Sequence, residues 1–215
     1  MSVWTQDRTV RTVKPLVFLL CLLPLAVLAW AAVTDGLGAN PVEALIHGTG
    51  DWALRFLLLT LAMTPLKRLL GQPWPIRFRR MLGLFAFFYA CLHLLTYAWI
   101  DQGFDWPGIL QDVVKRPYIT VGLAAFLLLV PLAVTSTRAM VRRLGRRWKS
   151  LHRAVYAIGV LAVVHFLWLV KADLLEPGIY ALILVILMLA RVPFGRIELV
   201  GRWLRGLAGP QRERA

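Results

Sequence analysis

Long apolar runs, separated by short polar or basic segments, recur along the whole chain. A helix needs about 20 residues to cross a bilayer core, because each residue advances the helix by only about 1.5 Å. The chain is 59% hydrophobic and 17% charged, which is too apolar for a soluble domain of this size. We therefore predict an all-α integral membrane protein, a six-helix transmembrane bundle, with spans over Pro15–Val33, Trp52–Leu66, Met81–Ile100, Tyr118–Thr135, Leu151–Val170 and Gly178–Arg191.

The first apolar run has two readings. It follows three basic residues and contains Ala29-Trp30-Ala31, a small-residue pattern that resembles a signal-peptide cleavage site. The apolar stretch Leu16–Val33 is longer than a signal-peptide core of about 7–15 residues, and further spans follow it. Retention as a membrane helix is therefore favoured over cleavage.

The basic residues indicate the orientation of the spans. The net charge is +14, and the basic residues cluster in alternate segments between the apolar runs. If the amino terminus is cytoplasmic, all but four of the 25 basic residues lie on the cytoplasmic side, the exceptions being Arg55, Lys115, Arg116 and Lys171. By the positive-inside rule both termini are predicted to be cytoplasmic. The positive charge then serves orientation and contact with lipid head groups rather than nucleic-acid binding.

Several kinds of chemistry have no support in the sequence. The spans contain no HExxH zinc motif, P-loop, Gly-x-Ser-x-Gly motif or dinucleotide fingerprint. Cys21 and Cys91 both lie inside apolar runs, which favours free packing thiols over a disulfide. We see no internal repeat and no separate soluble domain. Hydrolytic and nicotinamide-dependent functions are therefore not indicated.

Two of the four histidines lie at matching depths in different spans. His93 lies 12 residues beyond Met81, and His165 lies 14 residues beyond Leu151, counted from the cytoplasmic starts of the third and fifth spans. Both are therefore roughly 18 to 21 Å from the cytoplasmic face. Two neutral imidazoles at one level are what the axial ligation of a six-coordinate haem requires. Simple hydrogen bonding between helices is the competing reading.

The role of His152 stays open. It lies 13 residues before His165, about 20 Å nearer the cytoplasm, and an unbent helix would turn the two side chains about 140° apart. At its depth the third span offers arginines and no histidine. His152 is therefore a haem ligand with a non-histidine partner, an interfacial residue, or part of a flavin or quinone site that includes Arg79, Arg80, Arg147, Trp148 and Arg153. His47 precedes the second run and is read as a helix-start or loop residue.

An ordered set of short motifs resembles a known family. The motifs are Thr64-Pro65-Leu66, Arg79-Arg80-Met81-Leu82-Gly83-Leu84, Cys91-Leu92-His93, Arg116-Pro117-Tyr118, Thr135-Ser136-Thr137 and Leu144-Gly145-Arg146-Arg147-Trp148-Lys149-Ser150-Leu151-His152-Arg153. Together they resemble the MsrQ (YedZ) family, the haem-binding membrane subunit of a periplasmic methionine sulfoxide reductase system. The resemblance extends from about Leu37 to Leu187. This family belongs to the ferric reductase-like transmembrane group, which includes NADPH oxidases.

The resemblance implies an electron-transfer subunit with no substrate chemistry of its own. It implies a multi-pass protein of the bacterial inner membrane that holds haem b, one or two per chain, and flavin mononucleotide (FMN). Electrons would come from the quinone pool or a cytoplasmic flavin reductase and pass to MsrP, a periplasmic molybdenum-cofactor enzyme that reduces methionine sulfoxide in proteins. By position, His93, His152 and His165 match the haem-linked histidines of the family.

The predicted spans, together with the resemblance, divide the chain into three segments. These are a cytoplasmic N-terminal segment (1–14), a ferric reductase-like transmembrane haem domain (15–191) and a basic cytoplasmic tail (192–215) that is too short for the dehydrogenase domain of NADPH oxidases. Two other functions remain as alternatives: a transporter or proton path that uses the intramembrane histidines without haem, and a membrane scaffold whose polar residues only join helices. A haem spectrum would separate the electron carrier from both.

Overall fold

The computed structural model describes residues 3–170 and 174–191, and within them the regular structure is entirely helical. The predicted tail 192–215 lies outside the described residues. The all-α prediction is confirmed for the described part of the chain. Its helices are α1 (Val3–Val33), α2 (Pro41–Leu70), α3 (Ile76–Leu95), the π-helix η1 (Thr96–Asp101), α4 (Trp106–Lys115), α5 (Pro117–Val134), α6 (Arg138–Leu144), α7 (Arg146–Leu151), α8 (Ala154–Leu169) and α9 (Leu175–Leu189).

Four helical stretches are long and apolar enough to cross a membrane: Val10–Val33, Ile76–Asp101, Pro117–Val134 and Arg146–Leu169. The apolar helix α9 is shorter. Many large apolar side chains on these helices are exposed, including most of those along α1. Such a surface fits lipid as the surrounding solvent, so the chain is a transmembrane protein with several apolar helices.

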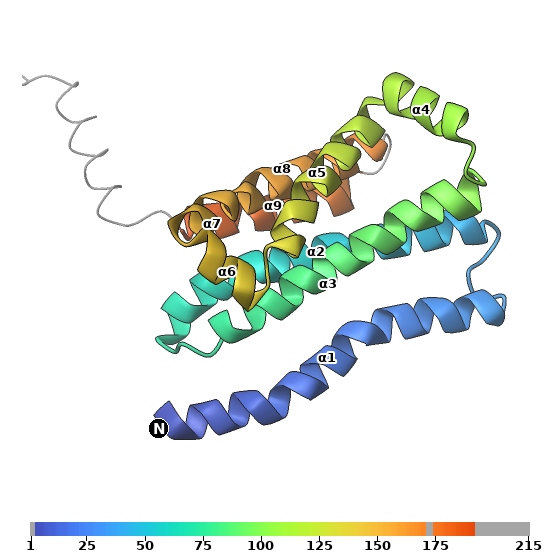
Figure 1. Cartoon of the computed structure of the whole chain (residues 1–215). Coiled ribbons are helices and arrows are strands. Elements are labelled where there is room, and N and C mark those ends of the chain that lie inside the picture. The colour runs from blue at the N-terminus through green and yellow to red at the C-terminus, as the bar shows by residue number, and fades with distance from the viewer. Residues whose placement is uncertain (1–2, 171–173, 192–215) are drawn as a thin grey trace, which may run out of the picture.

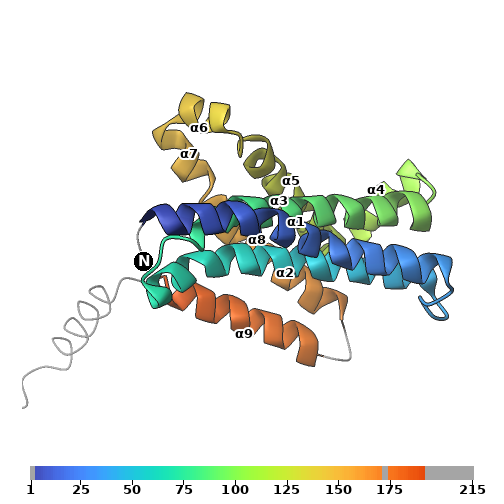
Figure 2. The same ribbon diagram turned by 90° about the horizontal axis from the view of Figure 1, so that it is seen from below.

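Two helix pairs form the centre of the bundle. α2 packs most extensively against α3, and α5 against α8, while α1 lies along the outside of the first pair and α9 beside α8 (Figures 1 and 2). Both views place the start of α1, the α2–α3 turn and the α6–α7 segment at one end of the bundle, and the α1–α2 connection and α4 at the other. The fully buried side chains of Leu61, Tyr89 and Ile158 mark the core between these pairs.

Helix α2 is much longer than the predicted span Trp52–Leu66. The side chain of Asn40 caps its start, and Gly71 ends it in the left-handed conformation, with φ of 62°. Asp51 and Arg55 interrupted the apolar pattern in the sequence. In the helix they lie one turn apart, 3.6 Å from each other, and so form an ion pair that the helix accommodates.

The fifth predicted span is divided. α7 ends at Leu151 and α8 begins at Ala154, so within the stretch Arg146–Leu169 a turn at His152 and Arg153 interrupts the helix that was predicted to run unbroken from Leu151. The backbone N–H of Arg153 donates to the carbonyl of Ser150 at 3.2 Å, a tighter turn than that of an α-helix. The angle of about 140° between His152 and His165, which assumed an unbent helix, therefore does not apply.

Tyr89 of α3 joins α1 to the core through a bridge at Pro24. Its hydroxyl accepts a hydrogen bond from the backbone N–H of Leu25 at 3.1 Å and donates one to the carbonyl of Cys21 at 2.9 Å. These two backbone groups lie four residues apart, and in a regular α-helix they would pair with each other. The tyrosine hydroxyl is therefore inserted into the helical hydrogen-bond ladder next to the internal proline.

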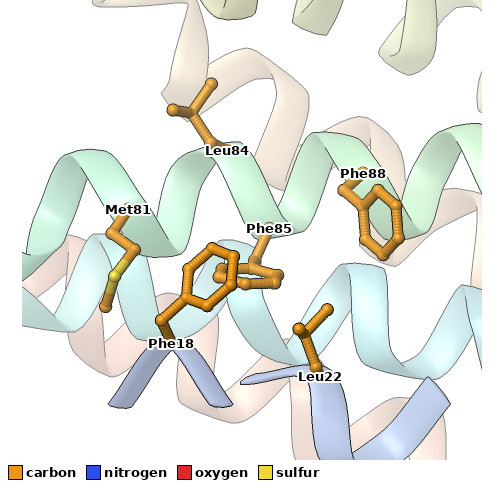
Figure 3. Close-up of a pocket in the computed structure, with 6 residues that line it drawn as sticks. All are labelled: Phe18, Leu22, Met81, Leu84, Phe85 and Phe88. Carbon is orange, nitrogen blue, oxygen red and sulfur yellow. The ribbon is translucent and has the colours of Figure 1, made fainter. Parts of the chain in front are cut away.

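An apolar pocket lies between α1 and α3. It has a volume of about 260 Å³, and Figure 3 shows the side chains that line it: Phe18, Leu22, Met81, Leu84, Phe85 and Phe88. The rings of Phe18 and Phe85 pack with their centres 5.1 Å apart. The lining has no polar side chain, so this pocket belongs to helix packing and has no groups for catalysis or metal binding.

Candidate functional site

His93 of α3 and His165 of α8 face each other across the centre of the bundle. Their ring centres are 6.1 Å apart, and the ring planes are nearly perpendicular, at 79°. Each ring lies on one of the two central helix pairs. The juxtaposition predicted from matched depth in the sequence is confirmed.

Each imidazole is held by a backbone carbonyl of the partner helix in its pair. Nδ1 of His93 lies 2.9 Å from the carbonyl oxygen of Ile46 in α2, and Nδ1 of His165 lies 2.7 Å from that of Tyr118 in α5. A carbonyl oxygen can only accept, so in both rings Nδ1 carries the hydrogen and Nε2 has the free lone pair. Among the described residues no hydrogen bond reaches either Nε2. Metal-binding histidines are held in this tautomer in the same way.

The ring spacing fits a single metal ion between two imidazoles. An imidazole nitrogen lies about 2 Å from the metal that it binds, and the ring centre lies roughly 1 Å behind that nitrogen. Two imidazoles on opposite faces of one ion therefore have centres roughly 6 Å apart, which agrees with the observed 6.1 Å. The two rings fit an axial pair.

A cavity of about 520 Å³ surrounds the two rings. This volume is within the range of cofactor pockets, about 300–1,000 Å³. The depth of the cavity is lined by apolar side chains from both central helix pairs, among them Leu57, Ala86, Leu129 and Ile158. Polar side chains occur toward one end, including Asn40, Glu43, His47, Asp51, Asp101 and Arg116. A cavity that is apolar in its depth and polar at one end suits a planar apolar cofactor with polar substituents at one edge.

A chain of polar contacts lies beside the polar end of the cavity. Tyr97 of η1 donates to Asp112 of α4 at 2.9 Å, and Asp112 pairs with Arg116 at 3.1 Å. Arg116 also donates to the hydroxyl of Tyr118 at 3.4 Å. The bond to Tyr118 and the charge of Asp112 raise the pKa of Arg116 above its ordinary value. The contacts join α4 to the residue whose carbonyl holds His165. Asp112 and Arg116 are four residues apart, a spacing that could have identified them as an ion pair from the sequence.

His152 lies near the opposite end of the bundle from α4, in the turn that follows α7. Its ring stacks on Trp148 with centres 3.9 Å apart and planes 25° apart, and its Nδ1 lies 3.1 Å from the Trp148 carbonyl. Its Nε2 is buried and makes no hydrogen bond of good geometry among the described residues, although the backbone carbonyl of Leu132 is close enough to act on the ring. Buried polar atoms are nearly always paired, so a bound group could offer this nitrogen a better-placed partner.

Of the five residues predicted to accompany His152, Trp148 stacks on the ring, and Arg79 is near enough for its charge to act on His152. Arg153 is exposed and donates to the hydroxyl of Ser150 at 3.4 Å. The side chains of Arg80 and Arg147 are exposed, and within the described residues no hydrogen bond or ring contact connects them to this group.

Arg191, just beyond α9, was not identified from sequence. It donates to the hydroxyl of Tyr156 at 2.8 Å, lies 5.2 Å from the centre of that ring, and also bonds the carbonyl of Leu61. Its Nε is buried without a partner in the described part of the chain, as is Oγ1 of Thr64. The charge of Arg191 also acts on Arg79. In the sequence Arg191 is one of many basic residues at the end of a span, so nothing distinguished it.

Comparison with known proteins agrees with this architecture. Residues 49–163 match the family model described as a ferric reductase like transmembrane component. The chain is 56% identical over 205 residues to the protein-methionine-sulfoxide reductase heme-binding subunit MsrQ of Azospira oryzae, covering 94% of this chain and 88% of the relative. It is 58% identical over 188 residues to the subunit of the same name from Rhodospirillum rubrum, with coverage of 86% and 90%.

A third relative, from Herminiimonas arsenicoxydans, has the same name and is 54% identical over 183 residues, covering 84% of each chain. Identity at this level over nearly the full length of both proteins exceeds what a shared fold alone requires. The resemblance inferred from the short motifs is therefore confirmed. This chain belongs to the MsrQ family, within the ferric reductase-like transmembrane proteins.

Proposed function

We propose that this chain carries electrons through the membrane by way of haem b held between His93 and His165. The observation that carries the proposal is the pair of opposed imidazoles, 6.1 Å apart, whose Nδ1 atoms are both engaged by backbone carbonyls. The relatives are named as heme-binding subunits of a methionine sulfoxide reductase. Bound haem would supply one-electron chemistry at this position.

The residues of the chain have separate tasks in this proposal. The carbonyls of Ile46 and Tyr118 hold the rings in one tautomer and orientation, and the Nε2 atoms supply the ligands. The apolar lining excludes water, which sets a low dielectric around the cofactor and so influences its potential. In this proposal the chain would pass electrons on without a bond from its residues to the final substrate. The chain is in this view an electron-transfer subunit rather than a complete enzyme.

We further propose a six-span topology, with α1, α2, α3, α5, α8 and α9 as spans and both termini in the cytoplasm. The end of the bundle that contains the α2–α3 turn and the α6–α7 segment also contains most of the basic residues that the structure describes. By the positive-inside rule that end is cytoplasmic. His152 and Arg191 then lie toward the cytoplasm, and α4 lies at the outer face of the bacterial inner membrane.

The cluster at His152 is proposed as the entry point for electrons. Among the described residues, neither Nε of Arg191 nor Nε2 of His152 makes a hydrogen bond of good geometry, so a bound group could satisfy both. FMN, a quinone or a second haem each fits this need, with the quinone pool or a cytoplasmic flavin reductase as the source of electrons. Trp148 offers a flat surface to a planar ring system, and Arg79 offers positive charge, while the exposed Arg80 and Arg147 would meet a carrier at the surface.

Electrons are proposed to leave at the outer face, toward a periplasmic MsrP-like molybdenum-cofactor reductase that acts on methionine sulfoxide in proteins. The contacts among Tyr97, Asp112, Arg116 and Tyr118 support this exit, because they connect exposed residues near α4 with the carbonyl that holds His165. A partner that binds near residues 101–117 would therefore come close to the cofactor.

Replacement of the two histidines tests the proposal. His93→Ala and His165→Ala proteins, purified in detergent, are compared with Leu95→Ala and Trp168→Ala, which alter exposed side chains on the same two helices. We expect a pyridine haemochrome assay and reduced-minus-oxidised spectra to show haem b in the wild type and both controls, and its loss from both histidine variants. A colourless wild-type protein would favour the transporter alternative, and full haem content in His165→Ala would refute the ligand assignment.

A further inference from the structure

We propose that Gly50 and Gly122 are positioning residues that seat the two axial imidazoles. Each belongs to one of two equivalent units that consist of a glycine, a backbone carbonyl and a histidine: Gly50, Ile46 and His93 in the first unit, Gly122, Tyr118 and His165 in the second. The inference rests on the proposed haem site between these histidines.

Both histidine rings touch a glycine where a side chain would collide. A Cβ atom on Gly122 would lie 2.7 Å from Nδ1 and 2.8 Å from Cε1 of His165. A Cβ atom on Gly50 would lie 3.0 Å from Nδ1 and 3.1 Å from Cε1 of His93. Contacts this short lie well inside the van der Waals separation of about 3.5–4.0 Å. Only glycine permits the His165 ring to occupy its observed position, and alanine at position 50 would require the His93 ring to shift by a few tenths of an ångström.

The glycine and the carbonyl act on the same helical turn. In each unit the accepting carbonyl belongs to the residue four positions before the glycine, so the two lie one above the other on the helix surface. A helical carbonyl has a second lone pair after its intrahelical bond, and that lone pair receives the imidazole N–H. The missing Cβ opens the approach to it. The turn therefore both accepts the ring and leaves room for it.

The two units are related by a constant spacing along the chain. Each member of the second unit lies 72 residues after its counterpart in the first, and the separation from carbonyl to histidine is 47 residues in both. Each unit joins two neighbouring helices, α2 with α3 and α5 with α8. The shared spacing concerns these three pairs of residues, and the side chains around them differ.

This duplication explains the arrangement of the rings. Each imidazole is fixed by one hydrogen bond at Nδ1 and by contact with a glycine, which together restrict rotation of the ring about its bond to Cβ. Two such seats lie against one cavity, and the ring planes that they hold are 79° apart. The angle between axial imidazole planes influences the low-spin EPR signal of ferric haem, so the seats have a spectroscopic signature.

Other helical glycines provide matched controls. A Cβ on Gly48, in the same helix as Gly50, would lie 2.8 Å from Leu28 Cδ2, the end of a flexible side chain, with no histidine involved. A Cβ on Gly83 in α3 would lie 3.5 Å from Thr60 Cγ2, an ordinary contact. Alanine normally stabilises a helix relative to glycine. A loss caused by alanine at the two seats must therefore come from the collision.

The test compares Gly50→Ala and Gly122→Ala with Gly48→Ala and Gly83→Ala as haem-containing proteins. Haem per protein, EPR g-values and the midpoint potential are measured, and gel filtration records folding. Because overpacking displaces the ring, we expect the haem affinity of Gly122→Ala to fall about tenfold and its EPR signal to shift, with a smaller change in Gly50→Ala. Both controls should match the wild type. Wild-type g-values and haem affinity in both seat variants would overturn the inference.

The outcome is separable from that of the proposed haem site. If His165→Ala loses haem while both seat variants behave as wild type, the ligand assignment stands and the glycine seats are refuted. If His165→Ala retains haem, the proposed site itself fails. Should Gly122→Ala not accumulate in the membrane, Gly50→Ala decides, because its predicted overlap is smaller and its control, Gly48→Ala, lies two residues away on the same helix.

Discussion

Replacement of Tyr89 by phenylalanine should destabilise the bundle through two backbone atoms of α1. The ring of Tyr89 is fully buried and packs against Phe56 with ring centres 5.3 Å apart. Phenylalanine preserves this packing and removes only the hydroxyl. The N–H of Leu25 and the carbonyl of Cys21 then lose the group that bridges them. A span in lipid has no water to replace that group.

The expected loss is about 2 kcal/mol in the free energy of unfolding. A buried backbone group left without a partner costs about 1–3 kcal/mol. Two groups are affected, but they lie four residues apart in one helix, so a direct hydrogen bond between them recovers part of the loss. For a domain of this size each kcal/mol corresponds to about 2–4 °C in Tm. The variant should therefore melt about 4–8 °C below the wild type.

Thermal unfolding in lipid nanodiscs measures this change, and hydrogen exchange localises it. The amide of Leu25 should exchange faster in Tyr89→Phe, while amides in α8 should not change. Tyr118→Phe is the control, because within the described residues its hydroxyl makes a single hydrogen bond, a long, exposed contact of 3.4 Å with Arg116. A Tm within about 1 °C of the wild type, together with unchanged exchange at Leu25, would show that the hydroxyl does not stabilise the break in α1.

Two further predictions concern the two ends of the bundle. Tyr97→Phe removes the 2.9 Å bond to Asp112, and we expect hydrogen exchange in α4 to increase about fivefold, equivalent to about 1 kcal/mol, with haem content unchanged. No increase would mean that α4 is held by other contacts. If the proposed entry site exists, His152→Ala should abolish binding of its redox group, measured as flavin, quinone or a second haem, and leave intact the spectrum of the haem proposed between His93 and His165. Loss of both signals would argue against separate sites.

The sequence alone predicted the helical class and the level of the site. Runs of apolar residues indicate membrane-spanning segments, because burying a polar group in hydrocarbon is costly at every position of a span. The depth of His93 and His165 followed from counting residues at a fixed rise per residue. The short motifs identified the family. None of these arguments needed to know which helices are neighbours.

Sequence reasoning failed where the outcome depends on contacts between helices. In a soluble bundle an apolar stripe shows which face of a helix is inward, but in lipid both faces are apolar, so the rotation of each span is not encoded in a simple periodicity. The carbonyl acceptors at Ile46 and Tyr118 are backbone atoms, which every residue has, and Gly50 and Gly122 resemble any other glycine in a span. The unpaired Nε of Arg191 likewise depends on helix packing.

The tertiary structure therefore decided how the histidines are held, while the sequence decided how deep they lie. Depth is a one-dimensional property, fixed by the helical rise and by the boundary between lipid and water. The seats of the two imidazoles depend on tertiary structure, because in each a carbonyl and a glycine of one helix contact a histidine of another. These contacts form only when α2 packs against α3 and α5 against α8, so they cannot be read from the order of residues along the chain.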